Sequence, residues 1–167
     1  MAPIIGIDPG VRGGMALLDE KGEVLDVIGF SKLKETEIAD TLRHWRDNYG
    51  ARYAYLEKVG FIKGDGGKGA FTFGRVYGFL RGVCSALTIH VCDVYPAMWQ
   101  SRMGCLTGGN KNISKNRAIA LFPRWHSRAV RGITHETADA LLIAEYGRLA
   151  QERLMVKDCA FGEGGGE

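Results

Sequence analysis

Carboxylates stand at three widely separated points of the sequence where regular elements are expected to begin or end. Asp8 follows a β-branched run at residues 4–7 and precedes a Pro-Gly turn, so its side chain should stand at a strand's carboxyl end. Glu57 closes a second such run. His135, Glu136 and Asp139 open a helical segment, in which residues three or four apart share a face. Oxygen ligands on a rigid scaffold suit Mg²⁺ or Mn²⁺, which act on phosphate esters, so the pattern predicts a metal-dependent nuclease.

Each of these signatures also has an ordinary structural explanation. Asp8 suits a simple turn, because Asp favours turns and the following Gly tolerates positive φ. Glu57 suits a solvated strand position, and His135 and Glu136 suit a helix N-terminus. Asp139 is harder to explain in this way, since it interrupts the apolar run at residues 138–144 and a buried carboxylate needs a partner or a metal. The three carboxylates together favour a site.

Length and composition are typical of one compact domain. The chain has 167 residues, of which 46% are hydrophobic, and contains no stretch that resembles a linker. We expect a single domain over residues 1–160 and a flexible Gly-rich tail over residues 161–167. No stretch reaches the roughly 20 apolar residues of a membrane span, and no basic segment followed by an apolar run opens the chain. These features predict an intracellular protein that is neither secreted nor bound to a membrane.

The four cysteines show no Cys-x-x-Cys spacing. They stand apart in the sequence at Cys84, Cys92, Cys105 and Cys159. A zinc site is therefore not expected, and reduced thiols are the expected state in an intracellular protein.

Charge is distributed unevenly along the chain, although the net charge is only +3. Twelve basic residues and two acids fall between Lys58 and His135, and no acid at all stands between Val94 and His135. A basic surface of this kind suits a phosphate backbone, from which binding releases counterions. The alternative is a soluble basic face without a partner. Glycines 64, 66, 67 and 69 around Lys63 and Lys68 favour a flexible basic loop directly after Glu57.

Hydrophobic periodicity predicts alternating strands and helices. Three strands should come first, then helix, strand, helix, strand and a group of helices, which is an α/β pattern with a five-stranded mixed central sheet flanked by helices. The expected strands are 3–8, 13–19, 23–30, 53–57 and 89–94. The expected helices lie around residues 38–45 and 73–87 and over 96–103, 114–122 (with Ser114 as the cap) and 136–153. Gly74, Gly78 and Gly82 form a stripe on the second helix that suits either a contact with a second subunit or internal packing.

Five motifs in this order resemble those of RuvC-type Holliday junction resolvases, with the phage and organellar members nearest. The similarity covers about residues 3–150, and the ordered set is far more specific than any one motif. The motifs are Ile-Gly-Ile-Asp-Pro-Gly at residues 5–10, Leu-Glu-Lys-Val at 56–59, Phe-Gly-Arg-x-x-Gly at 73–78, Tyr-Pro-x-x-Trp at 95–99 and Ala-Asp-Ala-Leu-Leu-Ile-Ala-x-Tyr-Gly at 138–147.

The resemblance implies a fold, an activity and partners. It implies an RNase H-like fold, a homodimer and Mg²⁺-dependent paired nicks across a four-way DNA junction. The chemistry of the site suits two Mg²⁺ ions per active site, with Mn²⁺ as a substitute. It also implies a setting in a bacterial or phage-infected cytoplasm or in an organelle.

Carried over position by position, the resemblance assigns the catalytic and metal-binding residues. Asp8 matches the first catalytic carboxylate, Glu57 the second and Asp139 the last. Family members place an Asp or His three or four residues before the last carboxylate. Here His135 stands four residues before and Glu136 three residues before; we expect His135 to be the ligand and keep Glu136 as the alternate.

The DNA-binding positions depart from the family pattern. Bacterial members carry an aromatic residue three positions after the second carboxylate, whereas here Phe61 stands four positions after it. Lys115 aligns well with a family lysine, but Gln100 replaces another, and Arg102 can compensate for it. The expected DNA-binding residues are Phe61, Lys63, Lys68, Arg75, Arg102, Lys111 and Lys115.

Other functions share parts of this pattern. Actin-like kinases and chaperones open with a related strand and turn, but they need two related domains and this chain is too short. A nuclease that cuts RNA in hybrids, or other branched DNA, would share the carboxylates and differ in substrate. A non-catalytic junction-binding protein is disfavoured because all the expected ligands are present.

Overall fold

A five-stranded sheet forms the centre of the molecule. The computed structural model describes residues 2–58, 67–106, 108 and 110–161, with the side chains up to residue 154. The sheet has the order β3-β2-β1-β4-β5. Its strands are β1 (Ile4–Asp8), β2 (Gly14–Leu18), β3 (Val24–Gly29), β4 (Tyr53–Glu57) and β5 (His90–Val94). The first three strands pair antiparallel, whereas β4 runs parallel to both β1 and β5, so the predicted mixed sheet is confirmed.

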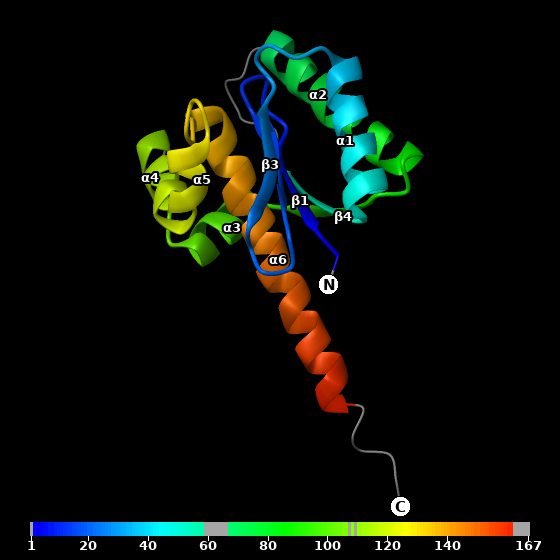
Figure 1. Ribbon diagram of the computed structural model, residues 1–167. Helices are drawn as coiled ribbons and strands as arrows, with labels where there is room; N and C mark the ends of the chain where they lie inside the picture. Colours follow the sequence, from blue (N-terminus) through cyan, green and yellow to red (C-terminus); the bar gives the residue numbers. More distant parts are fainter. Residues whose placement is uncertain (1, 59–66, 107, 109, 162–167) are drawn as a thin grey trace, which may run out of the picture.

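Helices cover both faces of this sheet. In Figure 1, α1 and α2 lie on one side of the sheet and the helices from α3 to α6 on the other. The helices are α1 (Glu35–Tyr49), α2 (Gly67–Ala86), α3 (Pro96–Met103), α4 (Lys111–Leu121), α5 (Pro123–Arg128) and α6 (His135–Phe161). None of the described helices is long and apolar enough to cross a membrane.

Several element boundaries differ from the sequence predictions. Helix α5 was not predicted at all, and α2 begins at Gly67, before its expected start. Ser114 does not cap α4; the cap is Asn110, whose side chain accepts a hydrogen bond of 3.0 Å from the backbone N–H of Asn112. Helix α6 continues to Phe161, beyond the predicted end at residue 153. The division into a domain and a Gly-rich tail stays a prediction, because residues 162–167 lie outside the described residues.

Strand side chains alternate between two hydrophobic clusters, one on each face. Ile5 and Ile7 of β1 pack in the cluster with α1 and α2, while Ile4 packs in the cluster with α3 to α6, and all three are fully buried. The period of two follows from the pleat of an extended chain. It places the last residue of β1, Asp8, on the face that α6 covers.

Helix α6 crosses the sheet at close range because glycines lie beneath it. A Cβ atom on Gly6 would stand 2.2 Å from both the carbonyl oxygen of Ala140 and the backbone nitrogen of Ala144. A Cβ on Gly14 would stand 2.7 Å from the carbonyl oxygen of Glu136. Only hydrogen fits at these two strand positions, so β1 and β2 fix the height and the register of α6.

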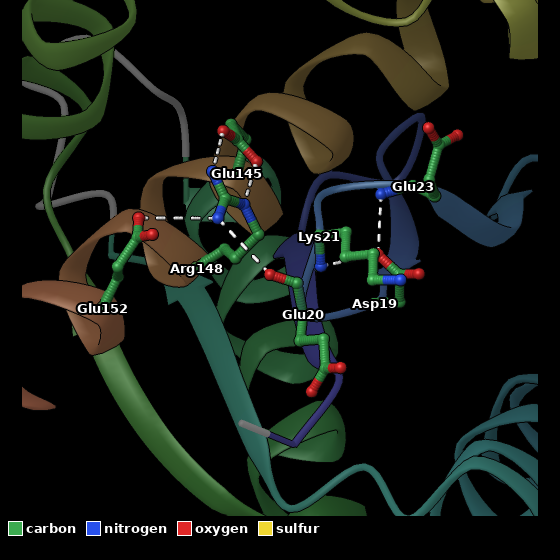
Figure 2. A network of polar contacts seen from close by, with 7 residues as sticks. All are labelled: Asp19, Glu20, Lys21, Glu23, Glu145, Arg148 and Glu152. Carbon is green, nitrogen blue, oxygen red and sulfur yellow. Dashed lines mark hydrogen bonds and ion pairs between the residues drawn. The ribbon is translucent and has the colours of Figure 1, made fainter.

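The β2–β3 turn is joined to α6 by the ion-pair network of Arg148 (Figure 2). The guanidinium donates from Nε and Nη2 to the two carboxylate oxygens of Glu145, at 2.8 Å each, and reaches the carbonyl of Glu20 and the carboxylate of Glu152 at 3.5 Å. The pair is largely shielded from water, since both side chains are about nine-tenths covered. Bidentate pairs of this kind add geometric specificity, and here they hold the sheet edge against the middle of α6.

The glycine stripe of α2 does not pack against any described residue. A Cβ on Gly74, Gly78 or Gly82 would meet nothing within 4 Å among the residues that the structure describes. Of the two interpretations suggested by the sequence, internal packing of these glycines is therefore wrong within the described part of the chain, and one face of α2 is left open.

Candidate active site

Two carboxylates end neighbouring parallel strands. Asp8 is the last residue of β1 and Glu57 the last residue of β4, and the two strands pair parallel with Ile7 opposite Leu56. Parallel strands bring their carboxyl ends to the same edge of a sheet, and alternation turns both side chains toward α6. The predicted positions of these two residues at strand ends are confirmed.

Asp8 is held by the tight turn that follows it. Its Oδ1 accepts a hydrogen bond of 3.0 Å from the backbone N–H of Gly10, and the N–H of Gly13 donates to the Gly10 carbonyl at 2.8 Å. A Cβ on Gly13 would stand 2.1 Å from the Asp8 carbonyl oxygen, so the turn requires glycine there. Burial raises the pKa of Asp8 to about 6, the Gly10 hydrogen bond and the charge of Lys111 lower it, and the charge of Asp139 adds to the rise.

Glu57 is held by a tryptophan of α3. The indole Nε1–H of Trp99 donates a hydrogen bond of 2.8 Å to Glu57 Oε1, and the Trp99 side chain is fully buried. The pKa of Glu57 is raised to about 7, mainly by burial and also by the charge of Asp8, against the lowering effect of the Trp99 hydrogen bond. The sequence analysis used Trp99 only as part of a motif and missed this role, which depends on how α3 packs after β5.

Asp139 lies among fully buried residues of α6. Its Oδ1 is buried and, in the described part of the chain, has no hydrogen-bond partner. Burial raises the pKa of this carboxyl, while the hydroxyl of the buried Ser114 and the charges of Lys111 and His135 lower it. An orphaned buried acceptor is rare in folded proteins and calls for a specific explanation, such as a ligand.

The two alternatives for the fourth residue lie on different sides of α6. His135 stands four residues before Asp139 on α6, and its charge acts on that carboxyl. Glu136 turns toward β3 instead, because its Oε2 would stand 2.6 Å from a Cβ atom on Gly29. Glu136 also lines a cavity of about 260 Å³ on that side, together with Lys32 and Arg131. His135 therefore lies on the carboxylate side, and Glu136 does not.

The chemistry of the donors fits a hard divalent cation. The charge of Asp139 raises the pKa of both Asp8 and Glu57, and the charge of Asp8 raises that of Glu57. Burial raises all three pKa values, and in the described part of the chain Asp139 Oδ1 has no hydrogen-bond partner. Such a group is costly without a compensating positive charge. Within the residues that the structure describes, no three His, Cys, Asp or Glu side chains are yet grouped closely enough to hold an ion. The donor set is therefore suitable for a metal but is not arranged as a closed coordination shell.

The predicted DNA-binding residues lie in different parts of the molecule. The charge of Lys111, at the start of α4, lowers the pKa of all three carboxyl groups. Lys115 lies one turn later on α4 and is half-buried. Arg75 is paired with Glu35 of α1 at 2.8 Å.

Two other predicted contacts line cavities. Lys68 borders a cavity of about 390 Å³ beside Val11, in the turn after β1, and Arg102 borders an apolar groove of about 1080 Å³ between α3 and α6. Phe61 and Lys63 lie outside the described residues. Phe71, on α2, is a large aromatic side chain that is 74% exposed, and the sequence analysis did not single it out.

Comparison with known proteins identifies the fold through structure rather than sequence. No family model matches the chain, and no curated protein matches it. Among solved structures, RuvC from Thermus thermophilus in complex with a Holliday junction substrate is similar with a TM-score of 0.64 and 15% identity, covering 91% of this chain and 96% of that one.

Two further solved structures show the same likeness. The yeast mitochondrial Holliday junction resolvase Ydc2 has a TM-score of 0.53 and 13% identity, covering 94% of this chain and 84% of that one. The fowlpox virus resolvase, solved with Holliday junction DNA, has a TM-score of 0.52 and 13% identity, covering 89% of this chain and 98% of that one. The chain therefore has the fold of RuvC-type resolvases, as its motifs implied.

Proposed function

We propose that this protein is a structure-selective endonuclease that resolves four-way DNA junctions by paired, metal-dependent hydrolysis of phosphodiester bonds. One observation carries the proposal: Asp8, Glu57 and Asp139 come from β1, β4 and α6 to one edge of a RuvC-type fold, and among the described residues a buried oxygen of Asp139 has no hydrogen-bond partner. Two similar structures were solved with Holliday junction substrates, which supports the choice of DNA.

The carboxylates would hold the metal ions, and other residues would orient the carboxylates. Asp8, Glu57, Asp139 and His135 supply oxygen and imidazole ligands, and Trp99 fixes one Glu57 oxygen by its hydrogen bond. When bound, two Mg²⁺ ions, or Mn²⁺ in their place, would supply the activation of water and the stabilisation of the leaving 3′ oxygen. The charge of Lys111 lowers the pKa of all three carboxyl groups, and this side chain would contact a phosphate near them.

Paired nicks need two active sites, so we infer a homodimer. Helix α2 presents the open face of Gly74, Gly78 and Gly82, where another backbone could approach closely. Static light scattering of the wild type beside Gly78→Leu tests this inference. A dimer that the leucine converts to a monomer supports it, and a monomeric wild type contradicts it.

A DNA substrate also implies a place of action. We infer that the protein works inside a cell or an organelle that holds recombining DNA. The three described thiols of Cys84, Cys92 and Cys105 are free, which agrees with a reducing compartment.

Competition binding without metal tests the choice of substrate. A labelled immobile four-way junction in EDTA would be challenged with unlabelled junction, linear duplex and RNA·DNA hybrid of equal length. We expect the junction to compete at least about tenfold better than duplex, because non-specific binding to the backbone is weak by comparison. Preference for the hybrid, followed by cutting of its RNA strand in Mg²⁺, would instead show a ribonuclease with the same fold. Tight junction binding without cleavage in any divalent metal would show a non-catalytic junction-binding protein.

A further inference from the structure

A cluster of polar side chains lies behind the Glu57 strand end, on the sheet face opposite the carboxylates. We call it the Asp93 cluster; it consists of Lys58, Tyr77, Arg81, Asp93 and Tyr95. Asp93 is the only described acid among the residues from Lys58 to His135, the basic part of the chain. Its charged and hydroxyl partners come from the end of β4 and from α2.

The Asp93 carboxylate accepts or pairs with three side chains of the cluster. Its Oδ1 accepts from Tyr77 OH at 2.8 Å and from Arg81 Nη1 at 2.5 Å, and its Oδ2 lies 3.6 Å from Lys58 Nζ. Arg81 Nη1 also donates to Tyr77 OH at 3.3 Å. The Lys58 ammonium lies 5.8 Å from the centre of the Tyr95 ring, within the range of a cation–π contact.

Strand register connects this cluster to the proposed active site. Leu56 of β4 stands opposite Asp93 of β5, Glu57 stands opposite Val94, and the Lys58 N–H donates to the Val94 carbonyl at 2.8 Å. Glu57 and Lys58 are consecutive, so alternation turns one side chain toward Trp99 and the other toward Asp93. The end of β4 is thus held from both faces.

Helix α2 depends on the same carboxylate for its polar attachment to the sheet. Its buried side chains are Leu80 and Cys84 only. In the described part of the chain, each polar contact between an α2 side chain and a sheet residue ends on Asp93. A separate ion pair, Arg75 with Glu35 at 2.8 Å, joins α2 to α1 instead. That pair provides a matched control.

We propose that Asp93 is a positioning residue, which fixes the end of β4, and with it Glu57, relative to α2. This inference rests on the proposed nuclease function. It is distinct from DNA binding, because removing the Asp93 charge would release Lys58 and Arg81, two partly exposed cations that could then contact phosphate. Loss of Asp93 should therefore impair metal-dependent cleavage without weakening the binding of DNA.

The test compares Asp93→Asn with Glu35→Gln in the full-length protein. For Asp93→Asn we expect single-turnover cleavage of a bound junction to slow by about tenfold, because small displacements of catalytic groups are costly. The Mg²⁺ concentration for half-maximal cleavage should rise, and junction affinity in EDTA should be equal or higher. Glu35→Gln breaks a similar ion pair of α2 and should leave the rate and the Mg²⁺ requirement at wild-type values.

The outcomes distinguish the inference from the function on which it rests. A wild type that cuts no substrate would overturn the proposed function. A wild type that cuts junctions, beside an Asp93→Asn variant with the same rate and Mg²⁺ requirement, would overturn the positioning role alone. Equal losses in both variants would also overturn it, since they would reflect a general loosening of α2. If Asp93→Asn fails to fold, Tyr77→Phe removes one hydroxyl donor to the same carboxylate and should raise the Mg²⁺ requirement by a smaller factor; an unchanged requirement would contradict the role.

Discussion

Burial raises the pKa of the Asp8 and Glu57 carboxyl groups toward neutral pH. Their pKa values are raised to about 6 and about 7, from ordinary values of 3.8 and 4.5. Near neutral pH the metal-free protein therefore carries carboxylates whose charged form is disfavoured, and Asp139 adds to their repulsion. A bound divalent cation would instead stabilise the charged carboxylates, because it favours the charged form of every ligand.

The stability of the metal-free protein should fall as the pH rises. A carboxyl whose pKa is higher in the folded than in the unfolded state binds more protons when folded, so its stabilising effect is present at low pH and lost as the pH rises through the folded pKa. For Asp8 this window runs from about 4 to about 6, and for Glu57 from about 4.5 to about 7. In EDTA above pH 7, Asp8→Asn should therefore have a free energy of unfolding about 1 kcal/mol or more above that of the wild type, and a higher melting temperature.

Thermal denaturation from pH 5 to pH 8 in EDTA, with and without added Mg²⁺, measures this effect. Mg²⁺ should raise the wild-type melting temperature and leave that of Asp8→Asn nearly unchanged. A wild-type melting curve that does not depend on pH in EDTA would contradict the assigned pKa directions.

The positions of His135 and Glu136 lead to opposite predictions for the cleavage rates of their variants. His135 lies on the carboxylate side of α6, whereas Glu136 packs against Gly29 of β3. His135→Ala should lower the junction cleavage rate by about a hundredfold, as expected for a lost ligand or general base, and Glu136→Gln should keep most of the activity. Single-turnover rates at saturating Mg²⁺ measure both variants. The reverse order of rates would transfer the role to Glu136.

At the scale of elements, the close contact between β1 and α6 determines where Asp139 stands. Gly6→Ala would bring a methyl group to 2.2 Å from the α6 backbone, so the helix would have to move. We expect a loss of roughly 3 kcal/mol or more in unfolding free energy, larger than a typical substitution. Gly67→Ala, at the start of α2 and outside the Gly74, Gly78 and Gly82 face, is the matched control, because its Cβ would meet no described atom within 4 Å; it should leave the free energy of unfolding nearly unchanged.

Denaturant titration of both variants provides the comparison. A stable Gly6→Ala variant with normal metal-induced stabilisation would show that α6 does not require this close approach.

Sequence patterns predicted most elements, and the failures have physical causes. Strands β1 and β2 were found because a short continuous apolar run reflects burial on both faces of a sheet. Helix α5 was missed because its six residues are too few to show a helical period, and none of them is buried. The start of α4 was placed late because the true cap, Asn110, precedes a turn of polar residues that shows no apolar period.

At the scale of the whole molecule, the sequence indicated the candidate metal ligands better than the residues that support them. Asp8, Glu57 and Asp139 could be found because a carboxylate at a strand end or in an apolar helix is conspicuous. The hydrogen bond from Trp99 to Glu57, the Asp93 cluster and the outward turn of Glu136 depend on tertiary packing between distant segments, and no local pattern encodes them. The lysine whose charge lowers the pKa of the carboxyl groups is Lys111, the first residue of α4. The sequence analysis placed the start of this helix at Ser114 and so left Lys111 outside it.

The most direct measurement is to map the cuts that the protein makes in a synthetic immobile four-way junction, with each strand labelled in turn, in Mg²⁺ or EDTA. We predict symmetric nicks in two opposing strands for the wild type. No nicks should appear in EDTA or with Asp8→Asn, although that variant should still bind the junction as tightly as the wild type. Cutting by Asp8→Asn, or wild-type cutting that persists in EDTA, would contradict the assignment of the carboxylates as a metal-dependent nuclease site.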